Sequence, residues 1–120
     1  MKKNKIYHLT HCGTCKKILN ELNTESCELS DIKLNKISEK ELDQLAKLAG
    51  SYEALFSRKA VKYQSLGLKD KSLTELDYKQ LILSDYTFIK RPIIKVGTML
   101  FIGHTKQAIE GGKQKLGTKN

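Results

Sequence analysis

Residues 6–22, IYHLTHCGTCKKILNEL, decide the fold of this 120-residue chain. They open on an apolar run from Ile6 to Leu9 that is typical of a short strand. Beyond Cys12 the apolar residues recur at i, i+3, i+4 and i+7, which is the spacing of a helix face: Cys15, Ile18, Leu19 and Leu22. The segment Cys12-Gly13-Thr14-Cys15 is therefore predicted to join a first strand to a first helix.

Further strand patterns lie after this helix and near the other end of the chain. Residues 27–33 (CELSDIK) predict a second, less regular strand, which completes a βαβ unit. Residues 93–96 and 99–102 are rich in β-forming side chains and are separated only by Gly97-Thr98. A two-residue turn that starts with glycine predicts a type II′ hairpin.

Helix boundary signals fill the rest of the chain. A capping box starting at Ser38 opens a helix that Gly50 ends, and a second box starting at Ser72 opens another. Thr105 is predicted to cap a last helix, which stops before Gly111-Gly112 and leaves a frayed basic tail. The middle third of the chain is therefore predicted to be helical.

The order of these elements predicts the fold class. A βαβ half and a ββα half that share one mixed four-stranded sheet are the two parts of an α/β, thioredoxin-like fold. The chain is then one domain, residues 1–120, with a helical insert at about 36–86.

Composition limits the classes of function. No apolar stretch approaches the length of a membrane span, and the N-terminus lacks the apolar core of a signal peptide, so a cytoplasmic protein without a membrane partner is expected. The formal net charge of +9 favours anionic partners, such as an acidic protein surface or a small oxyanion. No nucleic-acid-binding motif accompanies the charge, so direct nucleic-acid binding is not expected.

The two cysteines at the helix start are the candidate catalytic residues. A cytoplasmic chain keeps its thiols reduced, so a CxxC pair there points to redox catalysis or metal binding rather than a structural disulfide. At the mouth of the helix the backbone amides and the helix dipole should depress the pKa of Cys12 and make it the nucleophile. Cys15, one turn inside, is the candidate resolving thiol, whereas Cys27 lies in a strand and is expected to pack as a small apolar residue.

Two other readings of the cysteine pair stay open. His8, His11, Cys12 and Cys15 are all accepted zinc ligands and lie within eight residues. The alternation of side chains along a strand makes it doubtful that all four converge, and no metal is expected. Alternatively, both cysteines pack in the core and carry no chemistry.

The two arginines and the single proline of the chain point to a possible anion site. Arg58 and Arg91 are the only arginines among 22 basic residues, and a guanidinium grips an oxyanion with two hydrogen bonds. Pro92, the only proline, stands directly before a strand, where a cis-proline faces the reactive cysteine in thioredoxin-like folds. If both arginines converge on Cys12, they form a pocket for a tetrahedral anion such as arsenate.

These residues resemble the arsenate reductase (ArsC), Spx and YffB family over nearly the whole chain. The similarity includes Tyr7-His8 before Cys12, Phe56-Ser57-Arg58 in the middle stretch and, most specifically, Ile89-Lys90-Arg91-Pro92-Ile93. The resemblance implies that Cys12 is the nucleophile, that Arg58 and Arg91 hold an anion assisted by His8, and that Pro92 is the cis-proline.

The arsenate reductase branch implies attack of the Cys12 thiolate on arsenate, with no bound cofactor and with glutathione or glutaredoxin as electron donor. The chain departs from that branch by carrying Cys15-Lys16 after the nucleophile and by lacking a third arginine near the last strand, where His104 stands. The second cysteine is similar to Spx, a regulator that binds RNA polymerase and senses oxidation through a CxxC disulfide. A thiol-dependent, arsenate reductase-like oxidoreductase is the leading hypothesis and an Spx-like regulator the alternative.

Overall fold

The computed structural model describes residues 3–119 and divides the chain into two compact units. The first unit combines residues 1–36 with residues 91–120, and the second consists of residues 37–90. Within the described residues, no helix has the length and apolar character needed to cross a membrane.

The first unit is built on one mixed four-stranded sheet in the order β2-β1-β3-β4. Strand β1 pairs in parallel with β2, so that His8 lies opposite Asp31, and antiparallel with β3, which in turn pairs antiparallel with β4. Its elements follow the predicted βαβ and ββα order: β1 (Asn4–His8), α1 (Gly13–Glu21), β2 (Cys27–Asp31), β3 (Ile93–Val96), β4 (Met99–Ile102) and α5 (Lys106–Leu116).

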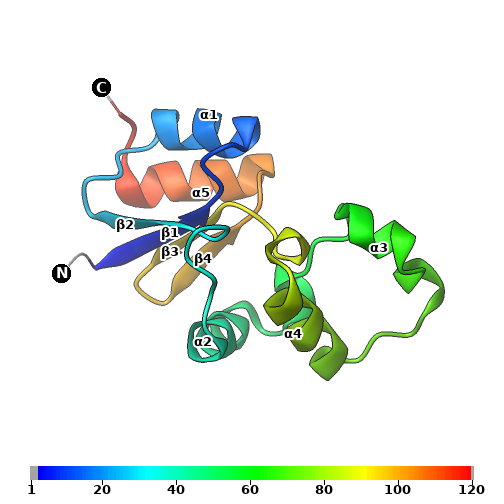
Figure 1. Ribbon diagram of the computed structural model, residues 1–120. Helices are drawn as coiled ribbons and strands as arrows, with labels where there is room; N and C mark the ends of the chain where they lie inside the picture. The colour runs from blue at the N-terminus through cyan, green and yellow to red at the C-terminus, as the bar shows by residue number, and fades with distance from the viewer. Residues whose placement is uncertain (1–2, 120) are drawn as a thin grey trace. The chain divides into compact units, whose positions relative to one another are not determined.

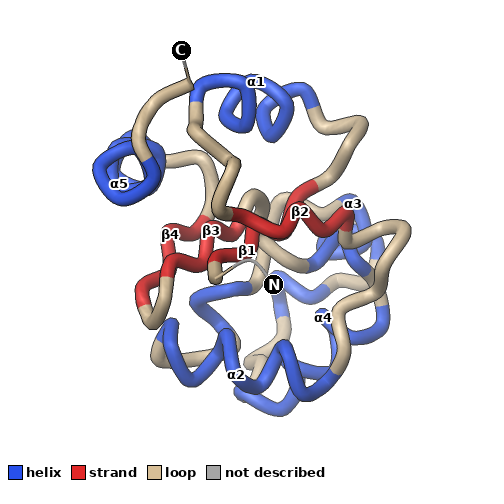
Figure 2. The backbone as a smooth tube through the Cα atoms, turned by 90° about the vertical axis from the view of Figure 1, so that its left-hand side faces the viewer, coloured by secondary structure: helices blue, strands red, loops and turns tan. Residues whose placement is uncertain are grey.

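Helices α1 and α5 lie together over one face of this sheet (Figures 1 and 2). The core between them is formed by fully buried side chains from both halves of the unit: Ile6, Ile18, Leu22, Cys27 and Ile94. Burying such side chains contributes about 1.5–3 kcal/mol each. This packing holds α1 against the sheet.

The second unit is helical and holds its own aromatic core. It contains α2 (Glu39–Ala49), α3 (Val61–Ser65), α4 (Glu75–Ser84) and three single-turn 3₁₀ helices, Glu53–Leu55, Leu68–Asp70 and Tyr86–Phe88. Phe56 stacks on Phe88 at a centroid distance of 5.3 Å and contacts the rings of Tyr63 and Tyr78. Aromatic pairs of this kind add about 0.5–1.5 kcal/mol beyond their buried area.

Several predicted boundaries agree with the structure. Strands β3 and β4 have the predicted ranges, and Gly97 in the turn between them has the positive φ, 62°, that a hairpin turn starting with glycine requires. The Ser38 side chain accepts the Glu41 N–H and begins α2, and Gly50 ends that helix in the left-handed conformation. Cys27 is 1% exposed and packs in the core as expected.

The predicted start of α4 at Ser72 is wrong. The helix is capped two residues later by Thr74, whose hydroxyl accepts the Asp77 N–H while the Asp77 carboxylate accepts the Thr74 N–H. Ser72 and Thr74 are each followed by an acidic residue three positions later, Glu75 and Asp77 respectively. Only Thr74 and Asp77 form the reciprocal pair of hydrogen bonds. The capping box usually has glutamate or glutamine at its fourth position, and here aspartate makes the same hydrogen bond.

The predicted end of the last helix before Gly111-Gly112 is also wrong, because α5 continues to Leu116. Both glycines lie where the helix approaches the sheet closely. A Cβ atom on Gly111 would stand 2.4 Å from the Phe101 ring, and one on Gly112 would stand 3.0 Å from the Ile94 side chain. The glycines therefore allow close packing of α5 instead of ending it.

Gly111→Ala should destabilise the protein, since the added methyl group overlaps the Phe101 ring. Overpacking of this size costs about 1–3 kcal/mol, and it outweighs the better helix propensity of alanine. Urea denaturation followed by circular dichroism measures the change. Gly13→Ala is the matched control, because nothing lies within 4 Å of its added Cβ; equal stability of the two variants would show that α5 does not pack this closely.

Candidate functional site

Cys12 stands at the N-cap of α1, between the sheet and the first turn of the helix. Its backbone is extended, with φ −93° and ψ 115°. Its N–H donates to the Leu9 carbonyl at 3.2 Å, which closes a turn after β1, and its carbonyl accepts the Lys16 N–H at 2.9 Å. The side chain therefore lies beside amides of the first turn, which have no partner within the helix.

The pKa of the Cys12 thiol is lowered from its ordinary value. Partial burial is the largest single influence and raises the pKa, but the remaining influences together outweigh it. They are hydrogen bonds from the backbone and the thiol of Cys15, a hydrogen bond from the Thr14 backbone, and the positive charge of Arg91. Each favours the charged form, so Cys12 is set up as a thiolate nucleophile.

Cys15 has the opposite character. Its side chain is fully buried, and this burial, together with the neighbouring Cys12 sulfur, raises the pKa of Cys15 to about 11. A hydrogen bond from the Leu9 backbone and the charge of Arg91 act against this rise without cancelling it. At neutral pH Cys15 is therefore a protonated thiol that donates a hydrogen bond to the Cys12 sulfur. Neither cysteine is part of a disulfide in the structure.

Arg91 and Pro92 belong to the same unit as the two cysteines. The Arg91–Pro92 peptide bond is cis, the conformation expected from the sequence, and Pro92 is fully buried. The Pro92 carbonyl accepts the Gly103 N–H at 2.8 Å, which ties the residue to the end of β4. The charge of Arg91 acts on both thiols.

His8 ends β1 and is 9% exposed. Side chains alternate along a strand, so His8 shares the face of Ile6, which packs against α1. Among the described residues, none hydrogen-bonds to its buried Nδ1 atom. Its role toward an anion stays a prediction.

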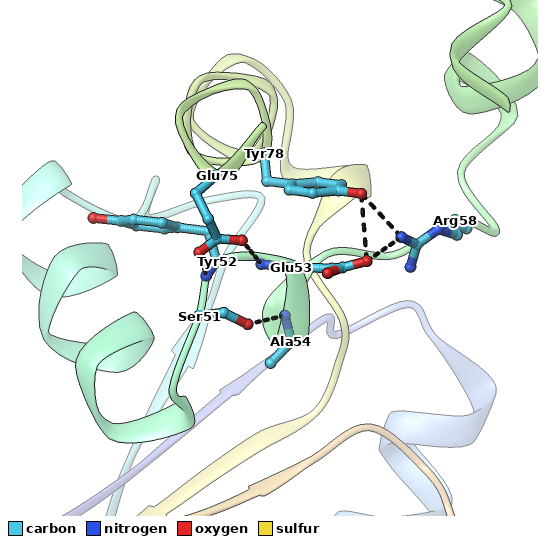
Figure 3. A network of polar contacts seen from close by, with 7 residues as sticks. All are labelled: Ser51, Tyr52, Glu53, Ala54, Arg58, Glu75 and Tyr78. Atoms are coloured by element: carbon cyan, nitrogen blue, oxygen red, sulfur yellow. Dashed lines mark hydrogen bonds and ion pairs between the residues drawn. The ribbon is translucent and has the colours of Figure 1, made fainter. Parts of the chain in front are cut away.

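Arg58 lies in the second unit, where its guanidinium is engaged within a polar network (Figure 3). Its Nη2 atom donates to the Glu53 carboxylate at 2.7 Å and to the Tyr78 hydroxyl at 3.0 Å. The Glu53 carboxylate is the largest influence that raises the pKa of Arg58. The sequence predicts that this arginine binds an anion, and in the structure its guanidinium pairs with a carboxylate of its own unit.

The sequence did not identify the role of Asp31. Its carboxylate accepts two hydrogen bonds from Thr10, two residues before Cys12, and two more from the backbone after β2. No local spacing rule relates residues 10 and 31. The available signal was the parallel pairing of the two strands, which brings their carboxyl ends to one edge of the sheet.

The zinc alternative gains no support. Within residues 3–119, no three His, Cys, Asp or Glu side chains lie close enough together to hold a metal ion. Of the four candidate ligands, His8 is buried in the sheet and His11 is exposed on the loop.

Comparisons with known proteins identify the family and the fold. No curated protein gives a significant match. An arsenate reductase from Vibrio cholerae has the same fold with a TM-score of 0.75, at 21% identity over 94% of this chain and 97% of that chain. An arsenate reductase (ArsC) related protein from Brucella melitensis matches with a TM-score of 0.67, at 23% identity over 92% and 93%.

The model of the ArsC family matches residues 7–111, a range that contains both cysteines, both arginines and the cis-proline. Solved ArsC-related structures share the mixed sheet and its helices. The chain therefore belongs to the ArsC family and has its thioredoxin-like α/β fold.

Proposed function

We propose that this protein is a thiol-dependent reductase of an arsenate-like oxyanion, with Cys12 as its nucleophile. The observation that carries the proposal is the environment of the Cys12 sulfur, which receives hydrogen bonds from Thr14 and Cys15 and the attraction of Arg91. These groups stabilise a thiolate at the start of a helix, where a tetrahedral anion also binds well. Membership of the ArsC family supports the same chemistry.

Arg91 is the proposed primary anion-binding residue, because its charge already acts on both thiols. A guanidinium can donate to two oxygens of one oxyanion and thereby hold arsenic in line with the attacking sulfur. His8 is proposed as an additional anion-binding residue, whereas the anion-binding role of Arg58 stays a prediction from the sequence.

The first proposed step is attack of the Cys12 thiolate on arsenic. A sulfur–arsenic bond forms, an As–OH bond breaks, and the departing hydroxide takes a proton and leaves as water. In the second step the Cys15 sulfur, after losing its proton, attacks the Cys12 sulfur. A disulfide forms, the sulfur–arsenic bond breaks, and its electron pair reduces arsenic(V) to arsenic(III), so two thiols lose the two electrons that arsenic gains.

The raised pKa of Cys15 suits this order of events. Cys15 stays protonated while it stabilises the Cys12 thiolate, and the loss of negative charge on Cys12 after attack removes one of the influences that keep the Cys15 pKa high. Glutathione or a glutaredoxin then reduces the disulfide, or a glutathione thiol takes the place of Cys15 in the second step. Either route restores two reduced cysteines.

A coupled assay tests the proposal. Purified protein is mixed with arsenate, glutathione, glutaredoxin, glutathione reductase and NADPH, and arsenite is measured together with NADPH consumption. We expect equimolar arsenite and NADP⁺ at a rate proportional to protein concentration. Arsenite production no faster than in the mixture without the protein would contradict it.

A second candidate function, an Spx-like redox sensor, is favoured by one observation: the Cys12 and Cys15 side chains are in direct hydrogen-bond contact. Such a pair can form an intramolecular disulfide under oxidation without any oxyanion. This function requires that the chain co-purify with RNA polymerase to an extent that changes between reducing and oxidising conditions. Absence of binding in both conditions excludes it.

A further inference from the structure

We propose that Asp31 is a positioning residue for Cys12: it holds the turn that delivers Cys12 to the start of α1. The proposal rests on the proposed function only in taking Cys12 as the reacting thiol. Asp31 acts through Thr10 and touches neither cysteine in the contacts described below.

The carboxylate of Asp31 is bonded to two separate segments of the chain. One oxygen, Oδ2, accepts the Thr10 backbone N–H at 2.9 Å and the Thr10 hydroxyl at 2.5 Å. The other oxygen, Oδ1, accepts the backbone N–H groups of Lys33 and Leu34 at 2.8 and 3.2 Å. Four hydrogen bonds to one carboxylate, two of them across 21 residues, exceed what the end of a strand requires for its own loop.

The bonds to Lys33 and Leu34 are local and have an ordinary explanation. An aspartate often accepts the amides two and three residues on and thereby turns the chain after a strand. The Ile32 N–H donates to the His8 carbonyl at 2.9 Å, which already extends the pairing of β2 with β1. The loop after β2 is therefore well held without the bonds to Thr10, and those bonds need another reason.

That reason is the turn from Leu9 to Cys12. The Leu9 carbonyl accepts the Cys12 N–H at 3.2 Å, so Thr10 is the second residue of a four-residue turn and Cys12 is the last. Fixing both the backbone and the hydroxyl of Thr10 fixes the direction in which the turn enters α1. In that geometry the hydrogen bonds from Thr14 and Cys15 reach the Cys12 sulfur.

The hydrogen bonds between Asp31 and Thr10 do not depend on pH near neutrality, because Asp31 stays ionised there. The Thr10 hydroxyl and amide, followed by the Lys33 and Leu34 amides, hold the pKa of the Asp31 carboxyl far below its ordinary value. The carboxylate is therefore ionised wherever Cys12 can be a thiolate. Hydrogen bonds to an ionised acceptor are about twice as strong as neutral ones.

Positioning and simple electrostatics predict opposite signs when the carboxylate is neutralised. Removing a nearby negative charge by itself makes a thiolate easier to form and lowers the Cys12 pKa. Loosening the turn removes hydrogen bonds from the Cys12 sulfur and raises that pKa. The one oxygen of Asn in Asp31→Asn can accept from the Lys33 and Leu34 amides or from the Thr10 N–H but not from both, so the variant weakens the tie between the two segments. Thr10→Val removes only the hydroxyl bond to Asp31.

The test is the rate of Cys12 alkylation by iodoacetamide as a function of pH, with the modified residue assigned by mass spectrometry. We expect the profile of Asp31→Asn to move to higher pH, with alkylation below the midpoint slowed about fivefold, as for the loss of about 1 kcal/mol of hydrogen bonding. Thr10→Val, which removes the hydroxyl and keeps the branched shape, should move the profile in the same direction. Thr10→Ser keeps the hydroxyl, so its alkylation profile should match that of the wild type.

Two controls make the result decisive. Glu25→Gln removes one exposed carboxylate in the same unit and should leave the profile unchanged. The double variant Thr10→Val/Asp31→Asn should be no slower than Asp31→Asn alone, because both changes break one tie. If Asp31→Asn does not fold, Thr10→Val carries the comparison.

An unchanged or faster alkylation in Asp31→Asn, or effects of the two single variants that multiply, would overturn the proposal. The assay contains no arsenate. Its outcome is therefore separate from whether arsenate is the substrate.

Discussion

Replacing Cys12 with Ser is expected to reduce thiol-dependent arsenate reduction by more than about 1,000-fold, because a serine hydroxyl is neither ionised at neutral pH nor able to form a disulfide. We expect the variant to keep the fold. Cys12 occupies the N-cap of α1, and serine is among the best residues at that position. Loss of turnover with retained or higher thermal stability is therefore the expected combination.

Cys27→Ala is the matched control for the loss of a thiol. Cys27 is buried in the core of the first unit beside Ile6 and Leu22. Its truncation should lower stability while leaving the turnover of the folded protein near the wild-type value. Turnover by Cys12→Ser at more than about 0.1 per cent of wild type, the level that a 1,000-fold loss leaves, would show that another residue attacks the oxyanion.

Removing the charge of Arg91 is the change with the second largest expected effect. Arg91→Ala should lower kcat/KM for arsenate about 100-fold, which corresponds to the loss of one or two charge-assisted hydrogen bonds. It should also move the pH profile of Cys12 alkylation to higher pH, because the charge of Arg91 is one of the influences that lower the Cys12 pKa. Steady-state kinetics and alkylation measure the two effects separately.

Arg91→Lys separates charge from geometry. Lysine keeps the positive charge, so the alkylation profile should stay close to that of the wild type, but it cannot donate in a planar fork, so kcat/KM should still fall about tenfold or more. Lys106→Ala, at the exposed start of α5, controls for the general loss of one charge. A lysine variant with full activity would show that Arg91 contributes charge alone.

The fold followed from short-range patterns because those patterns reflect local physics. The strand pattern before Cys12 and the helix spacing after it are properties of the backbone and of one buried face, and both appear in the structure as β1 and α1. The hairpin around Gly97 was equally predictable, since its turn depends on one residue with positive φ.

The error at the end of α5 came from tertiary packing, whereas the error at the start of α4 was a choice between two neighbouring capping residues. A glycine pair usually ends a helix, but Gly111 and Gly112 lie against Phe101 and Ile94, and that contact exists only after the sheet has formed. The rarity of Arg58 led to the prediction that it binds an anion, and that role stays a prediction. The Glu53 carboxylate that accepts its proton could not be recognised without the fold of the second unit.

The sequence was enough to predict a reactive cysteine in the candidate site, but not the hydrogen bonds that surround this cysteine. The sequence placed Cys12 at a helix start, which is enough to expect a low pKa. It could not show that the Cys15 thiol donates to Cys12, or that a carboxylate 21 residues from Thr10 holds the turn. Such contacts between residues distant in sequence depend on strand register.

The most direct measurement is the pH dependence of Cys12 alkylation in the native, reduced chain, followed by mass spectrometry. The lowered pKa of Cys12 requires a profile whose midpoint lies below the ordinary value for a cysteine thiol, with no modification of Cys15, whose pKa is raised to about 11, across the neutral range. A midpoint at or above the ordinary cysteine value, or faster modification of Cys15 than of Cys12, would contradict the assignment of Cys12 as an activated nucleophile.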